Sequence, residues 1–274
     1  SEVIIKIPTN SNGVINAEDI FNIIEEVGDD LALVFLPGVQ YYSGQVLPMH
    51  DIAKASHSVG AKVGIELAHG VGNIELKLSE WDIDFAVWCT YKYLNSGPGS
   101  IAACYINEKY LNIEDIQRLH GWWGNKLETR FEMENNFEYS NTANVWQVSN
   151  PPILSMVPIK AALDIIEDAG GVQVLREKSI SMSKYFDYLL EKELDKDIEL
   201  ITPTEVENRG CQLSLKVINK NISGRDVFNS LLLKGVSCDW RYPDVIRVAP
   251  VPLYNSYIEI YNFVRILKSI INNF

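Results

Sequence analysis

The sequence predicts an α/β fold in which a mostly parallel sheet with flanking helices is followed by a smaller α+β domain. Short apolar runs alternate with segments of helical periodicity in the first half, which is typical of strands joined by helical crossovers. From about residue 151 onward, long amphipathic helices dominate instead. Apolar residues make up 47% of the 274 residues, which is ample for a core. We therefore expect a larger domain over 1–150, and an interdomain helix with a small C-terminal domain over 151–274.

The elements expected in the first half are strand 3–8, helix 17–27, strand 31–36, helix 48–59, and strands 61–68, 84–90 and 100–106. Asn16 is a suitable N-cap for the first helix. Ligands of parallel sheets bind beyond the carboxyl ends of the strands. Pro37, Glu66 and Lys92 all fall at or just past such ends, so we expect them on one rim of the sheet. Residues 120–150 are expected to be rich in loops.

The second half predicts a long helix over 153–166 that bridges the two domains, followed by a helix over 171–196. Strands are expected over 198–202, 210–217, 236–239 and 245–249. A helix over 224–234 begins after Ser223, with Asp226 in its first turn, where a carboxylate is favoured. A final helix covers 255–272.

Charge and cysteine content exclude several classes of function. The chain has 24 basic and 36 acidic residues, a net charge of −12, which argues against nucleic acid and membrane surfaces as partners. The apolar runs are far too short to span a bilayer. The four cysteines and four histidines show no metal-ligand spacing, so no metal site is expected. Cys89 and Cys104 lie in apolar runs and are expected to be small core residues. Unpaired cysteines favour a reducing, cytoplasmic setting.

A lysine at the end of an apolar run is the most informative feature of the chain. The run 84–89 reads Asp-Phe-Ala-Val-Trp-Cys, and Lys92 follows it directly before the glycine-rich turn 95–99. At such a position desolvation disfavours the ammonium form, and the free amine can form a Schiff base. A surface lysine in a strand-to-loop turn remains the alternative.

A second strand end carries Glu66 and, three residues later, His69. A carboxylate beside a Schiff-base lysine suits pyridoxal phosphate, because it keeps the pyridinium nitrogen protonated and lets the ring withdraw electrons. Taken alone, Glu66 also fits an exposed carboxylate and His69 a hydrogen-bonded loop residue. Together with Lys92, Glu66 and His69 indicate a binding site.

Longer motifs then show a resemblance to a known family. They are GVQYYSGQ at 38–45, LAH at 67–69, VGN at 71–73, YKYLN at 91–95, GWWG at 121–124, SNPPIL at 149–154 and IRVAPVPLYN at 246–255. In this order they resemble kynureninase, a pyridoxal-phosphate enzyme of the aspartate-aminotransferase fold. The resemblance implies that 1–150 is a partial large, cofactor-binding domain, because the family carries a further N-terminal portion that holds the phosphate-gripping turn.

The resemblance also implies roles for individual residues. Lys92 would hold the cofactor and shuttle a proton at Cα, and Tyr91 would contact the phosphate and act as an acid or base. Glu66 would pair with the pyridinium, and His69 would lie against the cofactor or the substrate. Arg247 would bind the substrate carboxylate, although an arginine read alone fits a structural ion pair.

Two further cofactor residues follow from the resemblance. Trp122 would reach the cofactor phosphate of the other subunit of a homodimer through its indole N–H, whereas Trp123 fits a hydrophobic plug. Asn150 would contact cofactor and substrate at the active site, although Asn-Pro also favours a plain turn.

Two residues depart from the family pattern. Glu66 stands where the family has aspartate, and its extra methylene moves the carboxylate by about 1.5 Å. Pro37 stands where the family usually has serine, and proline cannot donate a hydrogen bond.

The resemblance implies hydrolysis of the Cβ–Cγ bond of L-kynurenine or 3-hydroxykynurenine. The products are anthranilate or 3-hydroxyanthranilate and L-alanine, in tryptophan catabolism and NAD biosynthesis. The alternative is an inactive fragment or pseudoenzyme that needs a partner to supply the missing N-terminal part. Another enzyme of the same fold, such as a cysteine desulfurase, would need a catalytic cysteine in a mobile loop, and none of the four cysteines stands so.

Overall fold

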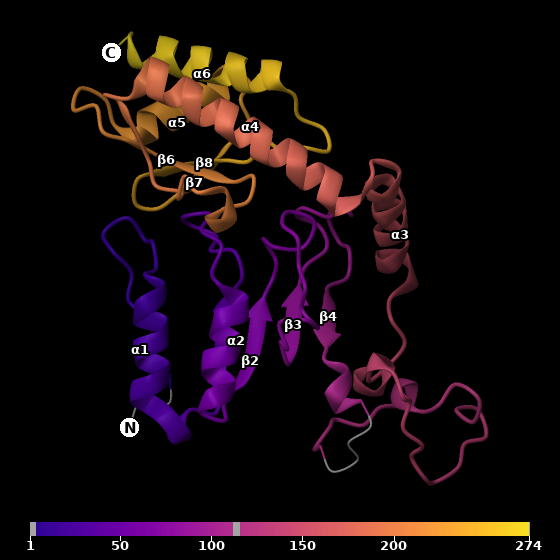
Figure 1. The fold of residues 1–274 in the computed structure, drawn as a ribbon. Coiled ribbons are helices and arrows are strands. Elements are labelled where there is room, and N and C mark those ends of the chain that lie inside the picture. The colour runs from indigo at the N-terminus through magenta and orange to yellow at the C-terminus, as the bar shows by residue number, and fades with distance from the viewer. Residues whose placement is uncertain (1–3, 112–115, 274) are drawn as a thin grey trace.

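The computed structural model describes residues 4–111 and 116–273, which form two sheets stacked end to end with their helices (Figure 1). Sheet A consists of β1 (Leu33–Pro37), β2 (Lys62–Glu66), β3 (Phe85–Trp88) and β4 (Ala103–Ile106), in that spatial order. The first three strands are parallel, and β4 is antiparallel to β3. A mostly parallel sheet was predicted, and the antiparallel edge is a common addition to such sheets.

Two helices, α1 (Ala17–Val27) and α2 (Met49–Ser58), pack on one face of sheet A. The Asn16 side chain caps α1 by accepting a hydrogen bond from the backbone N–H of Glu18 at 3.3 Å, as the sequence predicted. Val34, Ile65 and other alternate strand residues point toward these helices and are buried. The helices therefore cover the face of the sheet to which these residues belong.

The second sheet is antiparallel, with the order β5 (Ile198–Leu200), β6 (Leu213–Val217), β8 (Val245–Val248) and β7 (Asp239–Arg241). Three helices, α4 (Gly171–Leu194), α5 (Gly224–Leu233) and α6 (Tyr257–Ile271), form a core with it. Their packing is set by apolar faces at helical spacing, which the sequence also displays. The helix α3 (Ile153–Asp168) leads from the first half of the chain to α4 (Figure 1).

Short 3₁₀ helices complete the secondary structure; they are η1 (Gly28–Asp30), η2 (Glu108–Tyr110), η3 (Trp122–Gly124), η4 (Ala143–Trp146) and η5 (Val206–Asn208). The expected strand over 3–8 is wrong, because residues 4–8 form no strand. In the described residues sheet A ends at β1, and residues 4–8 do not pair with this edge strand. None of the helices in the described part of the chain combines the length and the apolar character needed to cross a bilayer.

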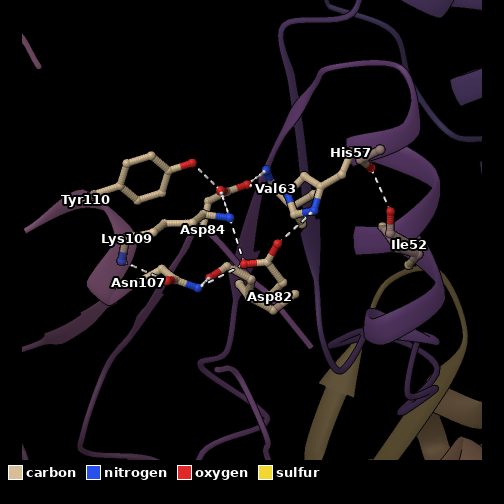
Figure 2. A network of polar contacts seen from close by, with 10 residues as sticks. Ile52, His57, Val63, Asp82, Asp84, Asn107, Lys109 and Tyr110 are labelled. Carbon is tan, nitrogen blue, oxygen red and sulfur yellow. Dashed lines mark hydrogen bonds and ion pairs between the residues drawn. The ribbon is translucent and has the colours of Figure 1, made fainter. Parts of the chain in front are cut away.

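A buried carboxylate ties the amino ends of the strands in sheet A to their surroundings (Figure 2). Asp84, immediately before β3, accepts hydrogen bonds from the backbone N–H of Val63 at 2.6 Å and from the phenol of Tyr110. It also meets His57 Nε2 and Lys109 Nζ, both at 2.9 Å. These contacts, together with hydrogen bonds to its oxygens, hold the pKa of Asp84 well below its usual range although burial opposes this. The network lies at the opposite end of the strands from Lys92.

Candidate active site

The carboxyl ends of the parallel strands place three of the predicted residues on one rim. Pro37 ends β1 and is paired in register with Glu66, which ends β2. Lys92 follows β3 by four residues, within a turn over 90–94. The sequence predicted this rim because parallel strands end at the same edge of a sheet.

Lys92 meets His69 at the centre of the rim. Lys92 Nζ and His69 Nε2 are 3.1 Å apart, within hydrogen-bond distance. His69 lies on the turn that follows β2, and its carbonyl accepts a hydrogen bond from the Asn73 side chain at 2.9 Å. The amide oxygen of Asn73 in turn accepts from the backbone N–H of Cys211, so the turn that carries His69 is fixed to the second half of the chain.

His69 is uncharged at ordinary pH. Its side chain is buried, and this burial, followed by the positive charges of Lys92, Arg247 and Arg241, lowers the pKa of His69 to about 3. With Nε2 facing an amine, the other ring nitrogen, Nδ1, is buried and has no hydrogen-bond partner among the described residues. An unsatisfied buried ring nitrogen beside a lysine amine is unusual, and it fits a polar group of a ligand.

Arg247 approaches this pair from the second sheet. Its guanidinium donates to the backbone carbonyl of Tyr41 at 2.8 Å and to the carboxylate of Asp239. The same carboxylate accepts from Arg241, two residues along β7. Burial lowers the pKa of Arg247, while Asp239 opposes this. Three cations and one carboxylate thus act on the neutral His69, a balance that favours an anionic ligand.

The loop over 40–46 brings the two halves of the site together. Backbone carbonyls of this loop accept hydrogen bonds from side chains of β6 and its neighbours, namely Thr202, Gln212 and Ser214. These bonds join residues more than 150 positions apart in the sequence. They hold β6 and its neighbour β8, which carries Arg247, against the rim of sheet A.

Glu66 is half-buried, and one of its carboxylate oxygens accepts a hydrogen bond from the backbone N–H of Ala68 at 2.6 Å. This bond turns the side chain back toward its own loop. The longer side chain of glutamate, relative to aspartate, thereby finds a local partner at the rim.

The two tyrosines that flank Lys92 have different environments. Tyr91 is half-exposed, and its interaction with the Cys89 side chain raises the pKa of its phenol. No cation is among the causes of this shift. Tyr93 packs edge-on against His69, with ring centroids 5.9 Å apart, and burial raises its pKa well above the usual value.

Trp122 and Asn150 are not brought to Lys92 within this chain. Residues 116–146 lie at the end of sheet A remote from the second sheet (Figure 1). There the Trp122 indole N–H donates to the carbonyl of Arg130 at 3.0 Å, and the residue is 44% exposed. Asn150 is exposed in the segment that precedes α3. Trp123 is half-buried under the Arg130 guanidinium, 4.2 Å from its ring centre.

The sequence reasoning missed Asp239, Arg241 and Tyr93. One signal was available for the first two. Residues two apart on a strand share a face, so the Asp-Trp-Arg run over 239–241 places a carboxylate and a guanidinium side by side. Their proximity to Arg247 follows only from the order of the strands, in which β7 and β8 are neighbours.

Comparison with known proteins gives a family match and several relatives. Residues 175–267 match the model of the kynureninase C-terminal domain. A curated kynureninase of Christiangramia forsetii is 49% identical over 254 residues, which cover 92% of this chain and 59% of that protein. The chain therefore spans about three fifths of the length of this relative.

Solved structures support the fold. A cysteine desulfurase from Thermococcus onnurineus superposes with a TM-score of 0.77 at 15% identity, covering 98% of this chain and 65% of that one. A C-DES mutant with glycine covalently linked to its pyridoxal phosphate cofactor superposes with a TM-score of 0.76 at 17% identity, covering 92% and 63%. The predicted fold class is confirmed. The resemblance to the kynureninase family, of which this chain matches a part consistent with the C-terminal portion, is likewise confirmed.

Proposed function

We propose that this chain carries the lysine, the ring-facing residues and the carboxylate-binding arginine of a kynureninase. The reaction is hydrolysis of L-kynurenine or 3-hydroxykynurenine between Cβ and Cγ, which gives anthranilate or 3-hydroxyanthranilate and L-alanine. The observation that carries the proposal is the contact of Lys92 with the neutral, buried His69 at the carboxyl end of a parallel sheet, with Arg247 acting on the same imidazole.

The residues present fit the ring end of pyridoxal phosphate. Lys92 supplies an amine for covalent attachment, and the unsatisfied Nδ1 of His69 offers a buried polar contact next to it. Glu66 supplies a carboxylate on the same rim for the pyridinium nitrogen, and Tyr91 a phenol for the phosphate. When bound, the cofactor supplies an electron sink for the carbanion that forms at the substrate.

The chain's own groups would orient the substrate and move protons. Arg247 would hold the α-carboxylate through guanidinium protons that Tyr41 and Asp239 leave free. Lys92 would take and return the proton at Cα, and Tyr91 would serve as an acid or base. His69, being uncharged, would pack against the ring without competing for the substrate anion. The attacking water ends as the hydroxyl of the aryl carboxylate, and its proton as a hydrogen of the alanine methyl group.

The same proposal extends to location, pathway and assembly. The protein would be a cytoplasmic enzyme of tryptophan catabolism and NAD biosynthesis that acts as a homodimer. Trp122 would then reach the cofactor phosphate of the other subunit, and Asn150 would complete the cofactor and substrate site. The exposed indole of Trp122 and the exposed Asn150 leave both side chains accessible to a second subunit. The division into a cofactor-binding domain over 1–150 and a small domain over 151–274 is supported by the two separate sheets.

A second candidate is an inactive form that needs a partner for the missing part of the large domain. It is favoured by apolar side chains left exposed on sheet A. The chain's 59% coverage of its relative is consistent with it. The two candidates differ in whether the rim binds the cofactor without help.

A titration with pyridoxal phosphate tests the proposal. Cofactor binding to the purified chain is followed by visible absorbance. The complex is then reduced with borohydride and digested, and the modified lysine is mapped by mass spectrometry. We expect the adduct on Lys92 and its loss in Lys92→Ala. Lys160→Ala is the matched control, since Lys160 is 80% exposed on α3. An adduct that persists in Lys92→Ala would refute the assignment. A folded chain that forms no adduct would support the second candidate.

A further inference from the structure

A groove separate from the candidate active site lies between the two halves of the fold. Its volume of about 430 Å³ is within the usual range for small-molecule sites, roughly 300–1,000 Å³. Both halves of the chain supply its apolar walls, which are formed by Leu47, Met49, Ile74, Trp81, Ile180 and Val206. A ligand in the groove would therefore contact α2, α4 and η5 at once.

A buried guanidinium forms the cationic part of the groove. Arg176, on α4, lines the groove and is 9% exposed, and its Nη2 donates to the backbone carbonyls of Val206 and Arg209. Its Nη1 is also buried and has no hydrogen-bond partner among the described residues. Because a buried donor without a partner is costly, an anionic group in the groove would be stabilised by Arg176.

The amino end of α2 adds a second feature that favours an anion. This helix begins at Met49, and Pro48 before it provides no side-chain capping hydrogen bond. In the part of the chain that the structure describes, the backbone N–H groups of His50 and Asp51 find no acceptor. All four residues line the groove. Unpaired N–H groups and the helix dipole together attract negative charge to this end.

Carboxylates surround the entrance of the same groove. Asp51, Glu75 and Glu207 line it and are exposed to solvent. Charge is therefore sorted by depth, with the guanidinium buried and the carboxylates outside. A simple anion would be repelled at the entrance, whereas a ligand that carries an ammonium group next to its anion matches both charges.

We propose that this groove is a second ligand site, distinct from the rim that carries Lys92, and that it binds a zwitterionic α-amino acid with an apolar or aromatic side chain. The carboxylate of the ligand binds Arg176 and the amino end of α2. The ammonium group binds the carboxylates of Glu75 and Glu207. The side chain of the ligand packs between Trp81 and Ile180.

The groove is also placed to act on the candidate active site. Ile74 lines it, and the neighbouring Asn73 holds the turn that carries His69 through a hydrogen bond of 2.9 Å to the His69 carbonyl. The same Asn73 accepts a hydrogen bond from the backbone N–H of Cys211 in the second half. A ligand that bridges the two halves would therefore stabilise the junction on which the position of His69 depends.

A titration of the ¹⁵N-labelled chain with L-phenylalanine tests the proposal. The chain has six tryptophans, and the indole N–H resonance of Trp81 is identified by its loss in Trp81→Phe. We expect this resonance to shift saturably with L-phenylalanine. Phenethylamine lacks the carboxylate and 3-phenylpropionate lacks the ammonium group, so each should bind about tenfold or more weakly than L-phenylalanine.

Matched variants test the location of the site. Ile180→Trp fills the groove and should abolish the shift of Trp81. Val174→Trp makes the same kind of change on the same helix, at a residue 49% exposed and outside the groove, and it should leave binding unchanged. Each variant is folded if its other indole resonances keep their positions.

A charge variant tests the role of the entrance. The double variant Glu75→Gln/Glu207→Gln alters two exposed side chains and should fold. It should weaken L-phenylalanine binding about tenfold or more, because the ammonium group loses both partners. It should not weaken the binding of 3-phenylpropionate, which has no ammonium group.

Four outcomes would overturn the proposal. They are an unmoved Trp81 resonance, equal binding of L-phenylalanine and either truncated probe, a shift that persists in folded Ile180→Trp, and a shift that is lost in Arg247→Ala. The last would show that L-phenylalanine acts from the candidate active site. None of these readouts depends on pyridoxal phosphate or on turnover, so failure here is distinct from failure of the proposed function.

Discussion

Removal of the Asp84 carboxylate should lower the chain's free energy of unfolding by a large fraction. Asp84 is 3% exposed and accepts hydrogen bonds from Val63, Tyr110, His57 and Lys109 (Figure 2). In Asp84→Ala the backbone N–H of Val63 and the phenol of Tyr110 lose their shared acceptor. Breaking a buried charged network by removing one member costs about 3–5 kcal/mol, against a total stability of about 5–15 kcal/mol.

Asp82 provides the matched control for this experiment. Its side chain is 58% exposed, although it also pairs with Lys109 at 2.7 Å and with His57 at 3.4 Å. Asp82→Ala should cost less than about 1 kcal/mol, as surface ion pairs do. In urea unfolding with a slope near 2 kcal/mol per M, the midpoint of Asp84→Ala should fall by about 2 M and that of Asp82→Ala by less than about 0.5 M. Equal shifts for both variants would refute the argument from burial.

The pH dependence of the chain's stability tests the direction of the Asp84 pKa shift independently. The pKa of Asp84 is lowered in the folded state, so its contribution to stability is present above the ordinary aspartate pKa. That contribution is lost as the pH falls through the lower, folded-state value. The wild-type chain should therefore lose stability more steeply below pH 4 than Asp84→Asn does. Parallel curves for the two proteins would contradict the assigned shift.

Three further predictions concern the candidate active site. Glu66→Asp should tighten pyridoxal phosphate binding several-fold by removing a misplacement of about 1.5 Å; weaker binding would show that the site suits glutamate. Arg247→Ala should weaken L-alanine binding at least tenfold, through loss of charge-assisted hydrogen bonds, and leave cofactor absorbance intact; loss of the cofactor would contradict its role. The pKa of His69 is lowered to about 3, so stability should fall as the pH drops from 6.5 toward 3. Urea unfolding at pH 7 and 5 should differ by about 2 kcal/mol more in the wild type than in His69→Asn, and an equal difference would refute the shift.

Most of the fold could be predicted because its signals are local. The apolar periodicity of α4 and α6 and the caps at Asn16 and Ser223 lie within a few residues of the elements that they define. Ser223 accepts a hydrogen bond from the backbone N–H of Asp226, as expected for an N-cap. The rim could also be predicted, since Glu66 and Lys92 follow apolar runs that become neighbouring parallel strands.

The charge environment of the site could not be predicted, because it depends on residues far apart in the sequence. His69 is neutral because it is buried beside Lys92, 23 positions away, and faces cations from the second sheet. No local pattern distinguishes it from a solvated loop histidine. Cys104 shows the opposite failure, since it was expected in the core and is exposed. Its apolar run predicted burial, but burial requires a second covering layer, and a strand sequence does not reveal whether that layer is present.

The face of sheet A opposite α1 and α2, here called the open face, meets the candidate active site at Glu66. Covering this face and binding the cofactor should therefore affect each other's free energy. Glu66 lies on the open face beside the exposed Val87, so solvent reaches the surface around its carboxylate. Two opposite charges 4 Å apart attract by about 1 kcal/mol in water and about 4 kcal/mol at the effective dielectric constant of a protein site. A covering layer that excludes water near Glu66 would therefore strengthen its hold on a pyridinium. Because coupling between two binding events is reciprocal, the cofactor must then favour docking of the layer by the same factor. Weak cofactor binding by the isolated chain would follow from the uncovered face, without any defect in Lys92, His69 or Arg247.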